Sequence, residues 1–189
     1  TIKNINLHKK EIVLNKGKKI QFSKLVSTIP LPEFCHLSKN ISPKVLKASK
    51  LLRCTAGILI SIGIKKKIKA RTWFYIYDKK FKASRIYLPS KLSRFNAPKN
   101  KSSLQAEIFV DNKENVTKEH LNYVKNNTIE NLVKIGVFEK KDLEVVNVKF
   151  IKYANVIFDK NYSRNRNLIL DYFKKYNVDF VGRFGKWAY

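Results

Sequence analysis

Gly57-Ile-Leu-Ile-Ser-Ile-Gly-Ile64 is the longest apolar run of the chain, and Ala56 precedes it without a break. Its residues are almost all β-branched or small, and no charged residue interrupts them. A continuous run of this kind is typical of a strand buried on both faces, and it is far shorter than the ~20 residues that span a bilayer. We therefore predict a fully buried strand over 56–64.

Further strands are expected after this run. The segments 71–77 and 84–88 are joined by Asp78-Lys-Lys-Phe81 and predict a hairpin. A polar loop over 89–103 follows, and the segment 104–110 predicts another strand. Strands therefore dominate the middle of the chain.

The residues before the run predict a second group of short elements. The segments 11–14 and 19–22 flank a turn in which Gly17 can adopt a positive φ, so they predict a hairpin. The segment 24–29 is extended in character and ends at Pro30 and Pro32. The segment 43–53 predicts a short helix that begins with a proline.

The last third of the chain predicts two helices among strands. The first runs from Thr117, a plausible N-cap, to Gly136, a plausible C′ residue, and the second covers 162–176. The first helix has one apolar face with three-to-four spacing, which consists of Leu121, Val124, Thr128, Leu132 and Ile135. Strands are expected over 143–150, 156–158 and 179–182.

Composition sets limits on the class of protein. The 189 residues are 44% hydrophobic and 12% aromatic, which is enough for a packed core in one domain or pieces of two. Thr1 opens the chain and Met is absent, so we expect a piece of a longer protein. No signal-peptide pattern opens it, and we expect a cytoplasmic location without a membrane span.

The net charge of +26 would ordinarily indicate a polyanionic partner. However, 33 of the 40 basic residues are lysines spread along the whole chain, and arginine forks, which recognise phosphate with defined geometry, are scarce. We interpret most of this charge as a solvated surface with weak, salt-sensitive attraction for anions.

Self-sufficient catalytic motifs are absent from the sequence. The six glycines form neither a G-x-G-x-x-G motif nor a P-loop. Cys35 and His36 are adjacent but lack a second ligand pair at metal spacing, so we expect no metal site. The two cysteines, Cys35 and Cys54, cannot form a disulfide framework of the kind that stabilises small secreted domains.

Three segments, in this order, resemble a known family. They are Leu25-Val-Ser-Thr-Ile-Pro-Leu-Pro32, Ser84-Arg-Ile-Tyr-Leu-Pro-Ser90 and Phe180-Val-Gly-Arg-Phe-Gly-Lys-Trp-Ala-Tyr189. Together they resemble the later part of the FAD-dependent amine-oxidase superfamily. The resemblance is to its protoporphyrinogen-oxidase-like and UDP-galactopyranose-mutase-like branch, in proteins of bacterial sugar and polysaccharide clusters. The Rossmann motif that binds the FAD pyrophosphate in that family is absent here.

The resemblance implies an α+β fold that forms part of an α/β FAD-binding fold. Residues 1–32 would contribute strands to the FAD-binding domain. Residues 33–160 would form a largely antiparallel substrate-binding sheet domain with the 117–136 helix. Residues 161–189 would return to the FAD-binding domain.

The resemblance also implies site residues. Gly182, Arg183 and Gly185 would lie beside the flavin of FAD, where Arg183 offers positive charge to the reduced ring. Arg85 and Tyr189 would bind the diphosphate of a nucleotide-sugar. No catalytic side chain is implied, because the flavin carries the chemistry. The segment Tyr153-Ala-Asn-Val-Ile157 differs from the family's usual Ala-Tyr-Val-Ile, and we assign it no role.

The resemblance therefore predicts part of an FAD-dependent oxidoreductase or flavin-using mutase, inactive without the rest of its parent protein, with a small-molecule substrate such as a nucleotide-sugar. Its partner would be the missing FAD-binding portion. The sequence leaves open whether the parent protein is an oxidase or a mutase. The alternative is a basic module without catalysis that binds nucleic acid or an anionic membrane. That alternative draws on the mixed aromatic and basic residues of 71–81.

Overall fold

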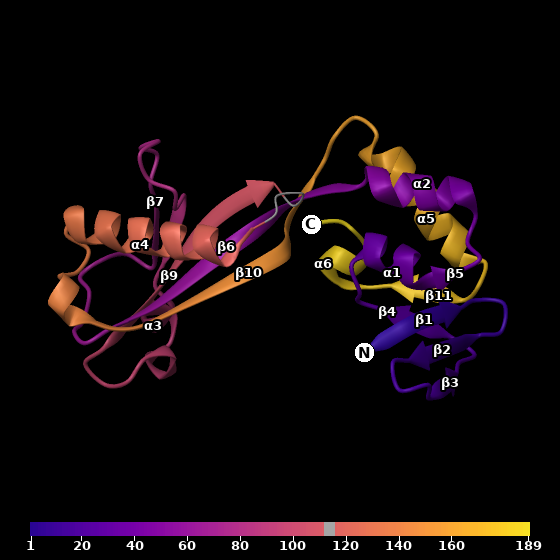
Figure 1. The fold of residues 1–189 in the computed structure, drawn as a ribbon, viewed down its shortest axis with the longest axis horizontal. Coiled ribbons are helices and arrows are strands. Elements are labelled where there is room, and N and C mark those ends of the chain that lie inside the picture. Colours follow the sequence, from indigo (N-terminus) through magenta and orange to yellow (C-terminus); the bar gives the residue numbers. More distant parts are fainter. Residues whose placement is uncertain (112–115) are drawn as a thin grey trace. The chain divides into compact units, whose positions relative to one another are not determined.

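A computed structural model describes residues 1–111 and 116–189 of the chain (Figure 1). The chain forms two compact units. The first contains Thr1–Cys54 and Asn155–Tyr189, and the second contains Thr55–Ala154. The predicted boundaries at 32 and 160 differ from these, because residues 33–54 and 155–160 are part of the first unit.

The first unit contains a four-stranded sheet in the order β3-β2-β1-β5. Its strands are β1 (Ile2–Asn6), β2 (Glu11–Leu14), β3 (Lys19–Gln21) and β5 (Ser38–Lys39). The predicted hairpin is confirmed: β2 and β3 pair antiparallel, and Gly17 in their turn has φ 80°. A separate parallel pair joins β4 (Leu25–Ser27) to β11 (Val178–Phe180), from distant parts of the sequence.

Four helices complete the first unit. They are α1 (Leu31–Leu37), α2 (Pro43–Leu51), α5 (Tyr162–Lys174) and α6 (Gly182–Gly185). Helices α2 and α5 were expected, and α2 begins after Ser42 with Pro43 in its first turn. Helix α1 was not expected, since Pro30 and Pro32 indicated only the end of a strand. Pro32 lies in the first helical turn, where a proline needs no intrahelical partner for its nitrogen.

Aromatic side chains form the centre of the first unit. Phe34 of α1, Phe173 of α5 and Phe180 of β11 pack edge to face, with ring centroids 4.9–5.6 Å apart. Phe34 and Phe173 are completely buried, and such pairs add to the hydrophobic effect of their buried area. This cluster connects the helices to β11, and therefore positions the segment that follows β11.

The second unit is built on a five-stranded sheet in the order β10-β6-β9-β8-β7. The strands are β6 (Arg53–Ile64), β7 (Trp73–Tyr75), β8 (Arg85–Tyr87), β9 (Ser102–Asp111) and β10 (Leu143–Ile157). The apolar run is β6, but the prediction that it is buried on both faces is wrong. Ile58, Ile60 and Ile62 on one face are buried, whereas Leu59 is partly exposed and Ser61 is exposed on the other. The two glycines of the run let β10 approach, because added Cβ atoms would contact Ala154 at Gly57 and Val145 at Gly63.

Helix α4 (Lys118–Lys134) packs against this sheet (Figure 1). The side chain of Thr117 caps it by accepting a hydrogen bond from the backbone N–H of His120. Val124, Thr128 and Leu132 are buried as predicted, whereas Ile135 is 46% exposed because the helix ends one residue before it. The result is a mixed α+β fold with a largely antiparallel sheet, as predicted.

Three predicted elements differ in extent. The segments 143–150 and 156–158 are one strand, β10. The polar loop contains the short helix α3 (Pro89–Leu92) and the 3-10 turn η1 (Arg94–Asn96), and a second 3-10 turn, η2 (Lys140–Asp142), precedes β10. The predicted strand over 179–182 ends at Phe180, because Gly182 adopts φ 75° and begins α6.

Candidate functional site

The C-terminal segment of the first unit follows a tightly constrained path. The backbone N–H of Val181 donates to the carbonyl of Ser27, which extends the β4–β11 pairing by one bond. Gly182 then turns the chain at a positive φ, and α6 presents Arg183 on the surface. The N–H of Ala188 donates back to the carbonyl of Arg183 at 2.8 Å, so Tyr189 returns toward Arg183.

The two glycines of this segment have different roles. A Cβ added to Gly182 would meet no atom within 4 Å, so the space beside this residue is open. A Cβ added to Gly185 would lie 2.9 Å from the carbonyl oxygen of Ser27 and 3.3 Å from the Cα of Thr28. Gly185 is therefore required for close backbone packing inside the unit, whereas Gly182 leaves room for an external group.

Arg183, Tyr189 and Asn155 form one cluster, which we call the C-terminal cluster. The guanidinium of Arg183 lies 4.0 Å over the ring of Tyr189, a cation–π contact. Arg183 Nη2 donates to Asn155 Oδ1 at 2.7 Å, and the Tyr189 hydroxyl donates to the same oxygen at 2.9 Å. One neutral amide oxygen thus orients both predicted binding residues.

Aromatic residues extend the cluster. Phe158, which is 54% exposed, lies 5.6 Å from the ring of Tyr189 and 4.6 Å from that of Tyr162, measured between centroids. The Tyr162 hydroxyl donates to the carbonyl of Trp187, a fully buried residue. These contacts hold the terminal residues against the start of α5 and leave an exposed aromatic and cationic surface.

Asn155 was not assigned a role from the sequence. It lies 28 residues from Arg183 and 34 from Tyr189, so no local spacing connects them. The one available signal was that Asn155 replaces the aromatic residue usual in the resembling family. In the structure, Oδ1 of Asn155 is the hydrogen-bond acceptor that Arg183 and Tyr189 share.

Arg85, the other predicted binding residue, lies in the second unit. It stands directly opposite Glu107 on neighbouring strands, and its Nε and Nη2 atoms donate to the carboxylate at 2.7–3.0 Å. This pairing with Glu107, with a further contribution from Tyr75, raises the pKa of Arg85. The guanidinium fork is therefore occupied within the sheet.

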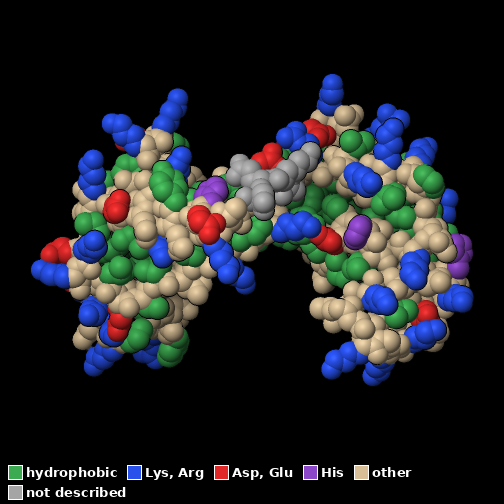
Figure 2. All heavy atoms as spheres, viewed as in Figure 1, with side chains coloured by type: hydrophobic (Ala, Val, Ile, Leu, Met, Phe, Trp, Pro, Cys, Tyr) green, Lys and Arg blue, Asp and Glu red, His purple; other side chains and the backbone are tan. Residues whose placement is uncertain are grey.

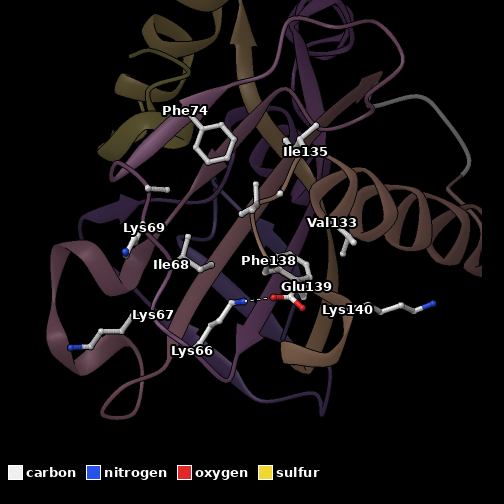
Figure 3. A pocket seen from close by; sticks show the side chains of 13 residues that line it. Lys66, Lys67, Ile68, Lys69, Phe74, Val133, Ile135, Phe138, Glu139 and Lys140 are labelled. Carbon is white, nitrogen blue, oxygen red and sulfur yellow. Dashed lines mark hydrogen bonds and ion pairs between the residues drawn. The ribbon is translucent and has the colours of Figure 1, made fainter.

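A cleft of about 730 Å³ lies between residues 66–74 and 133–140 of the second unit (Figure 3). Several lysines line it, but Lys66 points toward Glu139 and pairs with Glu139 at 3.3 Å and Asp142 at 2.6 Å. These pairs raise the pKa of Lys66 and lower the pKa of Asp142, and Lys141, together with Lys66, lowers the pKa of Glu139. The charge of Lys66 is therefore compensated, while Lys67, Lys69 and Lys140 also line the cleft.

Metal chemistry and chemistry at the Cys35 thiol find no support among the described residues. Across 1–111 and 116–189, no group of three His, Cys, Asp or Glu side chains is placed to hold a metal ion. Burial raises the pKa of the Cys35 thiol to about 12, which keeps it protonated and unreactive at neutral pH. In the same part of the chain, no helix is both long enough and apolar enough to cross a membrane.

Comparison with known proteins identifies the fold. No protein family and no curated protein sequence matches the chain. A reduced UDP-galactopyranose mutase matches 100% of this chain and 41% of its own length, with a TM-score of 0.87 and 18% identity. A candidate protoporphyrinogen oxidase from Exiguobacterium sp. 255-15 matches 92% of the chain and 38% of its own, with a TM-score of 0.66 and 11% identity.

A further match is the CLA-producing fatty acid isomerase from P. acnes, with a TM-score of 0.64 and 12% identity over 98% of this chain and 44% of its own length. The chain thus has the fold of mutase-like and protoporphyrinogen-oxidase-like proteins, which confirms the resemblance drawn from three short segments. It spans about two fifths of the length of these proteins.

Proposed function

We propose that this chain is part of an FAD-dependent oxidoreductase or flavin-using mutase, and that its substrate is a nucleotide-sugar or a related molecule of polysaccharide biosynthesis. The observation that carries the proposal is the C-terminal cluster. An exposed arginine is held in place by a neutral amide and an aromatic ring, next to a glycine with open space beside it.

The residues of the cluster fit a flavin in two respects. The space beside Gly182 would admit a planar ring close to the backbone, because no side chain or neighbouring atom fills it. Arg183 is exposed, and Asn155 orients it without neutralising its charge. FAD, when bound, would supply hydride transfer or nucleophilic attack from its N5 atom.

Arg183 would hold negative charge at this surface. A guanidinium has five N–H donors, and among the described residues Asn155 accepts from one of them. The remaining donors are directed from a fixed position, because Tyr189 and Asn155 restrict the side chain. A pre-oriented cation of this kind favours an anionic cofactor or substrate group without reorganisation.

Tyr189 would contribute a hydrogen bond to a diphosphate. Its single hydroxyl proton is donated to Asn155, so binding requires that this proton turn toward the phosphate oxygen. Rotation of the hydroxyl costs little, and Asn155 keeps its hydrogen bond from Arg183. Arg85 would have to exchange part of its pairing with Glu107 for phosphate, so we expect the larger contribution from Arg183 and Tyr189.

The test uses the full-length protein purified with its flavin. Arg183→Ala should weaken flavin or substrate-diphosphate binding by about tenfold or more, the usual effect of losing a charge-assisted hydrogen bond. The measurement is flavin release and nucleotide-sugar titration, followed by flavin absorbance and fluorescence.

Arg164→Ala is the matched control, because Arg164 is an exposed arginine on α5 in the same unit. It should leave both affinities unchanged. Equal flavin content, equal nucleotide-sugar affinity and equal turnover in the Arg183→Ala protein would contradict the proposal.

A further inference from the structure

The segment 89–101 of the second unit has an unusual surface. It contains four basic residues and no acidic one: Lys91, Arg94, Lys99 and Lys101. It is built from α3, the turn η1 and a short connection to β9, and the backbone at Pro89 and Ser93 closes these turns locally. The segment lies at the end of the sheet where β6 ends and β10 begins, since Ile64, Ser102 and Val145 line one hollow with it.

Large apolar side chains on this segment are exposed. Leu92 is 64% exposed and Phe95 is 82% exposed. Val145 of β10 is 61% exposed and lines a hollow of about 460 Å³ together with Ala97 and Pro98. Apolar groups that gather in this way, with a basic rim, mark an interaction surface more often than single exposed residues do.

Cations surround these apolar groups. A neighbouring hollow of about 920 Å³ is lined by Lys67, Arg94, Lys99 and Lys101, and no carboxylate lines it. The Arg94 guanidinium lies 4.9 Å over the Phe95 ring, and the Lys101 ammonium pairs with Glu144. The cleft in Figure 3 has Glu139 among its lining residues, whereas Lys101 is the only one of the four cations lining this hollow that has an ion pair among the described residues.

We propose that residues 89–101, together with Lys67 and Val145, dock the protein onto the surface of an anionic lipid bilayer. Leu92, Phe95 and Val145 would enter the boundary between head groups and acyl chains. Lys67, Lys91, Arg94 and Lys99 would contact the anionic head groups. This combination of apolar side chains with flanking cations is how peripheral segments lie in the membrane interface.

The observations favour a bilayer over a nucleic acid. Two of the three exposed apolar groups, Leu92 and Val145, are aliphatic and cannot stack on bases, whereas they gain free energy by leaving water for lipid. Three of the four cations proposed to contact the head groups are lysines, which act as point charges and lack the fork that orients phosphate recognition. Elsewhere the basic residues are scattered: on the face shown in Figure 2, blue side chains lie over both units.

The test is flotation of the full-length protein with vesicles of phosphatidylcholine alone and of phosphatidylcholine with phosphatidylserine, at about 0.15 M salt. We expect binding to the anionic vesicles only. The double variant Leu92→Ser, Phe95→Ser should lower the partition coefficient by about tenfold or more, through loss of apolar contact. The double variant Arg94→Gln, Lys99→Gln should lower it similarly.

The matched control is Lys16→Gln, Lys18→Gln, which removes the same charge from the exposed turn of the β2–β3 hairpin. It should change binding by less than about twofold. Equal losses in the control and in the 94/99 variant would overturn the proposal, because binding would then follow net charge alone. Failure to float with anionic vesicles, or Phe95-dependent binding to single-stranded oligonucleotides instead, would also overturn it. The flavin content of each variant is measured separately, since this proposal does not depend on the proposed enzymatic function.

Discussion

Two arginines in different regions of the molecule show how the same side chain acquires different roles. Arg85, on the sheet of the second unit, shares its fork with the carboxylate of Glu107, whose side chain is only 13% exposed. Arg183, on the surface of the first unit, has the neutral amide of Asn155 as its hydrogen-bond partner. The charge of Arg85 is therefore neutralised within the fold, whereas the charge of Arg183 remains available to an anion. The sequence motifs that contain these two arginines do not separate their roles. The roles differ because the hydrogen-bond partner of Arg85 is charged and that of Arg183 is neutral.

The first prediction compares a glycine of the segment that carries Arg183 with a glycine of the sheet. It tests whether Gly185 is packed against backbone more tightly than Gly63 is packed against a side chain. Gly185→Ala should lower the free energy of unfolding by about 3 kcal/mol, because the new Cβ would meet backbone atoms of Ser27 and Thr28. Gly63→Ala, in β6, should cost only about 1 kcal/mol, since there the contact is with the side chain of Val145, which can shift.

Urea unfolding of both variants measures this difference. A Gly185→Ala protein as stable as the Gly63→Ala protein would show that the 182–189 segment is not held by close packing against β4.

The second prediction concerns alkaline pH and the core of the first unit. The folded pKa of Cys35 is about 12, above the ordinary thiol value of 9.0, so the protonated thiol stabilises the fold below pH 9. That contribution is lost as pH rises from 9 toward 12, because the unfolded chain ionises first. Between pH 9 and 10.5 it should fall by about 2 kcal/mol.

Cys35→Ala removes this titration and leaves the lysines and tyrosines that ionise in the same range. Chemical unfolding from pH 8 to 10.5 should therefore show a steeper loss for the parent protein than for the variant. Parallel curves would mean that the thiol is more accessible to water than its burial indicates.

The third prediction, with the smallest effect, returns to the two arginines themselves. A double-mutant cycle with Arg85→Ala and Glu107→Ala should give a coupling of about 1 kcal/mol, in the range of well-formed, partly exposed ion pairs. The corresponding cycle with Arg183→Ala and Asn155→Ala should give about 0.5 kcal/mol, as for a solvent-exposed hydrogen bond to a neutral acceptor.

The salt dependence of the coupling free energy distinguishes the two cycles further. At about 1 M NaCl the Arg85–Glu107 coupling should decrease through screening, while the Arg183–Asn155 coupling should change little. The reverse pattern would place an uncompensated charge at Arg85 and would transfer the proposed anion-binding role to the sheet.

Local structure followed from the sequence where one side-chain pattern dominated. The apolar run predicted β6, and Thr117 and Gly136 predicted the ends of α4 within a residue or two. Predictions were less accurate where proline and glycine permit more than one structure. Pro32 lies in the first turn of α1 instead of only ending a strand, and Gly182 begins α6 instead of extending β11.

The candidate site was predictable in part. The segment 180–189 identified Gly182, Arg183 and Tyr189, and the structure brings Arg183 and Tyr189 into contact. Asn155 could not be found, because its partners Arg183 and Tyr189 lie 28 and 34 residues away in the sequence. The docking surface could not be found either, because exposure of Leu92 and Phe95 depends on how α3 and η1 fold over the end of the sheet.

The sequence by itself determined most of the strands and helices, the main turns and the resemblance in fold, since periodicity, caps and short motifs act over a few residues. Only the tertiary structure decided which charges are compensated and which surfaces remain exposed. Arg85 meets Glu107 across 22 residues and Arg183 meets Asn155 across 28. Such partners come together through strand register and packing of the whole chain, which no local pattern encodes.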